Sequence, residues 1–247
     1  MDNRLDAVIK ADLKMVEAEI ALSSTMMILM VLAVMTLFMS ILAIPALLAA
    51  IFFIYKGYWK LFYDSVFGSS CGLYQALPIP HSQRVLSKIF AASVCGLVPV
   101  LVLLIVFAFF NVGMGYGLMG NIFDLISDMG LKLGSVSGSP MNTALYLSSS
   151  VLNLLASDMA SVSIIFLAIT LYMVQPQGKR TSVRKILAIA VGWLALKALD
   201  FPDWMFKQLK VESPLLESGV DILFQIVVLL VTFRMTVRMM EKHYQKG

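Results

Sequence analysis

The stretch from residue 20 to residue 55 contains no charged side chain, which limits what this chain can fold into. As one α-helix it would be about 54 Å long, far more than the roughly 30 Å hydrocarbon core of a bilayer. We therefore divide it into two spans, at residues 22–40 and 44–61, with a tight turn near Ser40 and Pro45. Proline suits the first turn of the second helix. A single tilted helix with an interfacial extension is the alternative.

The remainder of the chain is similarly apolar. Of its 247 residues, 60% are hydrophobic and 14% are charged, whereas soluble domains are about 45–50% apolar. Further apolar runs predict spans at 90–110, 155–174, 186–201 and 218–235. The sequence thus predicts an all-α, polytopic transmembrane helical bundle with six spans, forming a single domain over residues 1–247.

An amphipathic pattern precedes the first predicted span. Apolar residues recur at helical spacing, at Leu5, Val8, Ile9, Leu13, Val16 and Ile20. Charged residues (Asp6, Lys10, Lys14 and Glu17) occupy other positions around the helix. This pattern predicts an N-terminal amphipathic helix that lies at the membrane surface. Packing of the same helix on another subunit is compatible with this interpretation.

Basic residues are distributed unevenly between the two sides of the predicted bundle. Of the 19 Lys and Arg residues, 15 fall in the N-terminal segment, around the loop 64–88, in the loop near 180 or in the C-terminal tail. Cytoplasmic segments carry such an excess, so both termini and both loops are predicted to be cytoplasmic. The basic residues gather at span ends rather than in one patch, which argues against nucleic-acid binding.

The sequence contains none of the common catalytic or nucleotide-binding motifs that we looked for. There is no G-x-x-x-x-G-K-[ST] phosphate loop and no H-E-x-x-H pattern, and His81 and His243 lie far apart. The only two cysteines, Cys71 and Cys95, are predicted at different depths, so no disulfide is expected. The aromatic and lysine cluster over residues 55–63 is typical of a membrane–water boundary. We expect no enzyme activity and no cofactor in this chain.

Asp158 is a carboxylate that the span boundaries place within the bilayer, and Asp221 lies near the start of the sixth span. An acidic residue at that depth is a candidate functional group, as a proton site, a cation site or a gate contact. The alternative is that the fourth span begins later and that Asp158 caps its N-terminus near the outer surface.

A short polar segment between apolar runs is more specific. Residues 74–88 read YQALPIPHSQRVLSK. This segment resembles the cytoplasmic loop of ABC-2 type transporter permeases, the membrane subunits of many bacterial ABC exporters. The resemblance is close over these fifteen residues and extends to the rest of the chain only through its layout. An ordinary juxtamembrane turn, broken by Pro78 and Pro80, is the alternative.

The resemblance implies a function and a set of partners. The chain would be the permease subunit of an ATP-driven exporter in the bacterial cytoplasmic membrane, paired with a second permease. A separate ABC ATPase would bind ATP and Mg²⁺ and dock on the loop. The cargo would be amphipathic or lipid-like, and peptide antibiotics and bacteriocins are a familiar class. The residues of the coupling loop would be Tyr74, Leu77, Pro78, Ile79, Pro80, Arg84, Ser87 and Lys88.

Two other functional classes remain open at this point. One is a non-transport membrane protein, such as an immunity or assembly protein. The other is an ion-coupled secondary carrier that uses Asp158. Similarity between the two halves of the chain would favour such a carrier, and the sequence shows none.

The charge asymmetry makes a direct prediction about topology. Single cysteines at Ser82, Ser137 and Ser182, introduced without Cys71 and Cys95, should respond differently to an impermeant thiol reagent in intact cells. We expect labelling at 137 and none at 82 or 182. Labelling at 82 or 182 without labelling at 137 would contradict the predicted orientation.

Overall fold

The computed structural model describes residues 2–35, 40–68, 79–114, 140–173, 181–209 and 214–244. These segments are almost entirely helical. The long helices are α1 (Asp2–Met35), α2 (Ala43–Trp59), α4 (His81–Met114), α6 (Pro140–Met173), α7 (Thr181–Ala198) and α9 (Pro214–Tyr244). Shorter elements are a 3₁₀ turn η1 (Ser40–Leu42), a π-helical turn η2 (Lys60–Asp64) and α8 (Phe201–Leu209). In lipid, a helix satisfies its own backbone hydrogen bonds, which is why long apolar segments adopt it.

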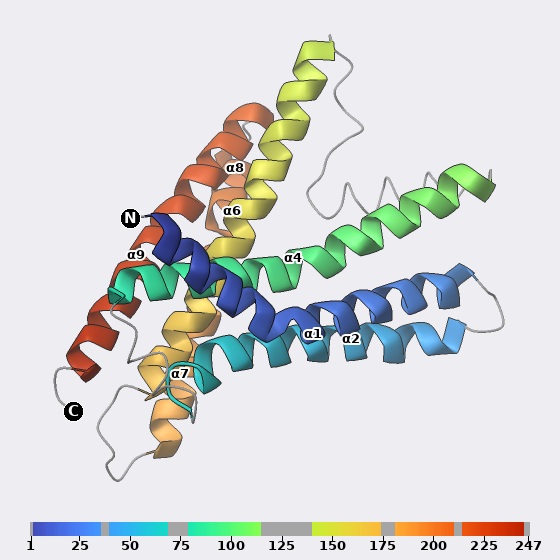
Figure 1. Ribbon diagram of the computed structural model, residues 1–247. Coiled ribbons are helices and arrows are strands. Elements are labelled where there is room, and N and C mark those ends of the chain that lie inside the picture. The colour runs from blue at the N-terminus through green and yellow to red at the C-terminus, as the bar shows by residue number, and fades with distance from the viewer. Residues whose placement is uncertain are drawn as a thin grey trace.

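The helices form two groups that run in different directions (Figure 1). In the first group, α1 packs along both α2 and α4. In the second group, α6 packs along α9 and also contacts α7. The groups meet where α4 contacts α6 and α9. The start of α1, the start of α4 and the end of α9 gather on one side of the molecule (Figure 1).

The division of the uncharged stretch into two helices is confirmed. Helix α1 ends at Met35 and α2 begins at Ala43 after η1, with Pro45 in its first turn. The predicted turn near Ser40 therefore lies where the structure places η1, although residues 36–39 are outside the described part. The structure does not show a separate interfacial helix at the N-terminus, because residues 5–20 and the first span belong to one helix of 34 residues.

Five helices are long and apolar enough to cross a bilayer within the described residues: Leu5–Val34, Ala43–Asp64, His81–Val106, Val151–Met173 and Ser218–Lys242. They correspond to the first, second, third, fourth and sixth predicted spans. The predicted fifth span, 186–201, falls largely on α7 (Thr181–Ala198), for which the described residues give an apolar helix from Ala188 to Ala198. The chain is therefore a multi-pass membrane protein with five candidate spans in its described part.

The surface of the bundle is apolar, whereas its interior holds many polar side chains. Ile41, Ile44, Phe52 and Ile105 are each more than 60% exposed, as expected where lipid replaces water. Between α6 and α9, the hydroxyls of Ser163 and Thr232 are hydrogen-bonded at 2.7 Å, and Thr232 Oγ1 also donates to the Val228 carbonyl. Small hydroxyl residues allow helices to approach closely and hold them together in lipid.

Aromatic side chains join the two groups of helices. The rings of Phe62 on η2 and Phe166 on α6 are stacked with centroids 4.3 Å apart, and both side chains are fully buried. Tyr58, also buried, lies next to Phe62. Part of the predicted aromatic boundary is therefore core, while Tyr55 and Trp59 remain about half exposed or more, at 60% and 48%.

Loss of this stack should weaken the contact between the groups. We expect Phe166→Ala to lower the free energy of unfolding by about 3–5 kcal/mol, since a fully buried aromatic side chain leaves a cavity. Phe52→Ala is a matched control, because Phe52 is 62% exposed on the outer surface. Thermal unfolding of the purified protein in detergent measures both. Equal effects of the two substitutions would show that the Phe62–Phe166 stack does not hold the groups together.

Candidate functional site

One face of α1 is buried against the other helices and includes two carboxylates. The fully or nearly fully buried side chains follow one stripe along the helix: Val8, Asp12, Val16, Glu19, Ser23, Met27 and Val31. The spacing of three and four residues keeps them on one side. Asp6, Lys10, Lys14 and Glu17 are exposed on the opposite side. The two buried acids therefore need partners from α2 and α4.

Asp12 and Lys88 form an ion pair inside the protein. Lys88 Nζ lies 3.2 Å from Asp12 Oδ1, and the side chains are 1% and 0% exposed. The Ser87 hydroxyl donates to Asp12 Oδ2 at 2.5 Å, and Lys88 Nζ also donates to Ser65 Oγ at 2.6 Å. Both carboxylate oxygens of Asp12 and two of the three N–H donors of Lys88 thus have polar partners. A buried pair persists only with such additional hydrogen bonds.

The π-helical turn η2 positions Ser65 for this cluster. The Ser65 N–H donates to the Lys60 carbonyl, five residues earlier, and its hydroxyl donates to the Leu61 carbonyl. A π turn occurs rarely and often lies at a functional site. Here it ends α2 so that the Ser65 oxygen accepts from Lys88 on α4. The cluster thereby connects α1, α4 and the segment that follows α2.

A second ionic contact lies two turns further along α1. Glu19, whose side chain is 4% exposed, receives both hydrogen bonds from Lys60 Nζ at 3.2 and 3.3 Å. Lys56 Nζ is 3.8 Å from the same carboxylate but is half exposed. Glu19 is the last charged residue before the uncharged stretch, so this contact lies about 10 Å further along α1 than Asp12. Together the two contacts fix α1 to both of its neighbours.

The residues of the predicted coupling loop fall into two sets. Tyr74, Leu77 and Pro78 lie outside the described residues. Ile79 and Pro80 immediately precede α4, and the Pro80 carbonyl accepts hydrogen bonds from the N–H groups of Gln83 and Arg84. Arg84, Ser87 and Lys88 lie on the first two turns of α4 and are buried. They are therefore helix residues rather than loop residues, and Lys88 pairs with Asp12 within the chain.

Asp158 lies within a helix and not at its start. Helix α6 begins at Pro140, more than four turns earlier, so Asp158 does not cap its N-terminus. The residue is in the candidate span Val151–Met173. It faces α4, where Asp158 Oδ1 lies close to Gly96. Ser93 on α4 is beside its carboxylate. The Tyr58 hydroxyl of α2 also approaches Gly96. Asp158 therefore lies further along α4, beside Ser93 and Gly96, than the Asp12–Lys88 pair.

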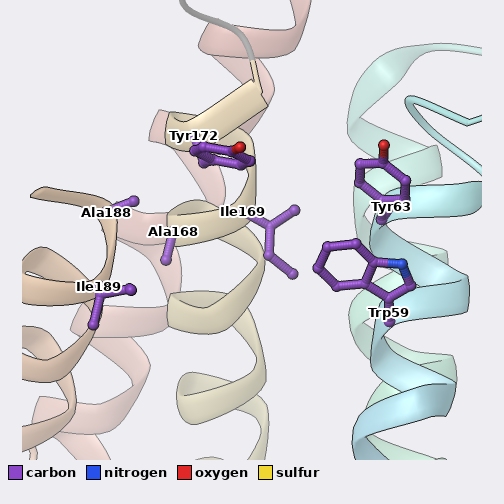
Figure 2. Close-up of a pocket in the computed structure, with 7 residues that line it drawn as sticks. All are labelled: Trp59, Tyr63, Ala168, Ile169, Tyr172, Ala188 and Ile189. Atoms are coloured by element: carbon purple, nitrogen blue, oxygen red, sulfur yellow. The ribbon is translucent and has the colours of Figure 1, made fainter. Parts of the chain in front are cut away.

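Residues of three helices line a pocket of about 340 Å³ (Figure 2). One side is formed by η2 and the last residue of α2, and the others are formed by α6 and α7. Its lining residues are Trp59, Tyr63, Ala168, Ile169, Tyr172, Ala188 and Ile189. Trp59 and Tyr63 are stacked with ring centroids 4.5 Å apart on one wall, opposite Ala188 and Ile189 of α7. The walls are apolar and carry hydroxyls only on Tyr63 and Tyr172. The pocket is suited to apolar groups and supplies no acid–base chemistry of its own beyond two phenols.

Sequence reasoning missed the two buried carboxylates of α1. It assigned Asp6, Lys10, Lys14 and Glu17 to the polar face but gave no role to Asp12 or Glu19. A signal was present, since Asp12 stands four residues from both Val8 and Val16 and so shares their apolar face. A carboxylate on an apolar face predicts a buried partner. The identity of that partner required the fold.

These features define a polytopic α-helical membrane protein with an ionic cluster at one end of its first helix group. Comparisons of the chain with models of protein families, with curated proteins and with solved structures found no match. Among the described residues there is also no group of three or more His, Cys, Asp or Glu side chains arranged to hold a metal ion.

Breaking the buried pair should be much more harmful than breaking an exposed one. We expect Asp12→Asn to cost about 3–5 kcal/mol of stability, because Lys88 is left buried without a countercharge. The exposed pair of Lys10 and Asp6, at 2.9 Å, is the control, and Asp6→Asn should cost at most about 0.5 kcal/mol.

A double substitution tests whether the charge, rather than the packing, is responsible. Asp12→Leu combined with Lys88→Met removes both charges, and it should recover most of the stability lost in Asp12→Asn. Thermal unfolding in detergent measures all variants. An effect of Asp12→Asn as small as that of Asp6→Asn would contradict a buried ion pair.

Proposed function

We propose that this chain is the permease subunit of an ATP-driven exporter that resembles the ABC-2 type. The observation that carries the proposal is the segment 74–88, which resembles a cytoplasmic coupling loop in sequence and whose last residues form the start of α4. Under the proposal, an ABC ATPase docks on this segment and binds ATP and Mg²⁺. A second permease and the surrounding lipid complete the assembly, in a bacterial cytoplasmic membrane with both termini cytoplasmic.

The contacts of Ser87 and Lys88 support this assignment. The two residues end the resembling segment, and they bond to Asp12 of α1 and to Ser65 after η2. A displacement of the segment at the start of α4 would therefore act on α1 and α2 together. Such a rigid connection is what a coupling segment needs, because transport requires helix groups to move as bodies.

The composition of the bundle favours an apolar or amphipathic cargo. Besides the two ionic contacts of α1, the described interior holds Arg84, Asp221 and Gln225, and most of its other side chains are hydroxyl, aromatic or aliphatic. The pocket beside Trp59 and Tyr172 also has apolar walls (Figure 2). We therefore propose an amphipathic or lipid-like substrate, for which peptide antibiotics and bacteriocins are one class.

The docking role makes a specific prediction. Leu77 and Ile79 are apolar residues in a segment that is predicted to face the cytoplasm, as expected of a surface that inserts into a partner. Replacing both with Asp should leave the protein inserted in the membrane but prevent binding of its ATPase. The measurement is co-purification of the ATPase, together with ATP turnover of the complex in lipid.

Ala11→Asp provides the control, since Ala11 is exposed on α1, outside the segment 74–88, and the substitution adds negative charge elsewhere on the side that is predicted to be cytoplasmic. We expect this variant to retain the ATPase. Unchanged ATPase binding and turnover in the double Asp variant would overturn the coupling role.

A further inference from the structure

Polar groups from three helices meet at the junction between the two helix groups. A Cβ atom at Gly96 of α4 would lie 2.5 Å from the Tyr58 hydroxyl of α2 and 3.3 Å from Asp158 Oδ1 of α6. The glycine thus leaves space that the phenol and the carboxylate occupy together. Ser93, one turn earlier on α4, lies beside the same carboxylate. Ser93 is midway along the candidate span His81–Val106.

Two oxygen atoms of this cluster are buried and have no hydrogen-bond partner among the described residues: Asp158 Oδ2 and Ser93 Oγ. The Ser93 side chain is only 4% exposed. Buried polar atoms are almost always hydrogen-bonded, and each exception calls for an explanation. A proton on the Asp158 carboxyl group would allow that group to donate a hydrogen bond to the neighbouring Ser93 oxygen.

The charges around Asp158 do not neutralise it. Within the described part of the chain, the ion pairs involve Asp6, Asp12, Glu19 and Asp200 but not Asp158. The other titratable groups that face it are Tyr58 of α2 and Cys95 of α4. Glu19 of α1, on the far side of Cys95, already binds Lys60. An ionised carboxylate within a bilayer needs a partner of opposite charge.

The small number of oxygen atoms in this cluster favours a proton over a metal cation as the bound species. Calcium requires six to eight oxygen ligands and magnesium six, whereas this cluster offers the carboxylate, one serine and one phenol. A proton needs only one carboxylate oxygen. It removes the charge and converts Asp158 into a hydrogen-bond donor, for which Ser93 Oγ is an acceptor.

We propose that Asp158 is a proton-binding site at the junction of the two helix groups. With the proton bound, the neutral carboxyl group donates to Ser93 and allows α6 to pack on α4. When the groups separate, water reaches the carboxyl group and the proton is released, leaving an aspartate anion. Proton binding therefore favours the arrangement in which the groups are in contact. This inference is independent of the ATPase proposal, because it concerns the isolated chain.

Infrared spectroscopy of the full-length protein in lipid nanodiscs tests the site directly. At neutral pH we expect the wild type to show the carbonyl stretch of a protonated carboxylic acid, with the expected shift in deuterium oxide. Asp158→Asn should remove this band. Raising the pH should convert the band to a carboxylate signal in one step that Asp158→Asn lacks.

Two further variants keep the test decisive. Glu17→Gln removes an exposed carboxylate of α1 and should leave the protonated band unchanged. Ser93→Ala is a small change that should retain the band but shift its frequency, because the acceptor is lost. A wild-type spectrum without a protonated carboxyl band at neutral pH overturns the proposal. So does a band that persists in Asp158→Asn, or one that Ser93→Ala leaves at the same frequency.

Discussion

The buried ion pair of Asp12 and Lys88 is the interaction on which the first helix group depends. Removing either charge from water is unfavourable by several kcal/mol, and neither residue is tolerable in its position without the other. The two residues are far apart in the sequence, so the pair forms only when α1 lies against α4. Ser87 and Ser65 complete the cluster, and Ser65 is placed by the end of α2. One electrostatic requirement thus specifies how three helices are arranged.

The second helix group is attached by interactions of another kind. Its contacts with the first group include a stack of two phenylalanine rings and the half-buried Asp158, while α6 and α9 are joined by a pair of hydroxyls. Stacking and hydroxyl contacts are each worth about 1 kcal/mol and have less strict geometry than a buried ion pair. The junction between the groups therefore has less strict geometry than the interior of the first group, which the buried ion pair fixes.

Much of the architecture followed from the sequence because length and apolarity decide it. The uncharged stretch was too long for one span, and the structure divides it where Ser40 and Pro45 indicated. The predicted fifth span falls on α7, where the described residues give a shorter apolar helix than the five candidate spans. Asp12 was missed for another reason, since its burial depends on a lysine that only the fold brings near. Lys88 was placed in a cytoplasmic loop, but α4 begins before it and buries it. Local patterns do not contain such pairings.

The π turn η2 changes the direction in which the side chains that follow it point around the helix axis. A π turn holds one more residue than an α turn, so every side chain after it is rotated by about 100° around the helix axis. The Phe62 ring on η2 stacks on α6, and Ser65 just beyond reaches Lys88. The extra residue lets neighbouring positions on one helix serve two different partners. Deleting a single residue between Lys60 and Asp64 would restore a regular helix and turn Ser65 away from Lys88. The register of this short segment therefore determines both the contact of Ser65 within the first group and the contact of Phe62 with α6.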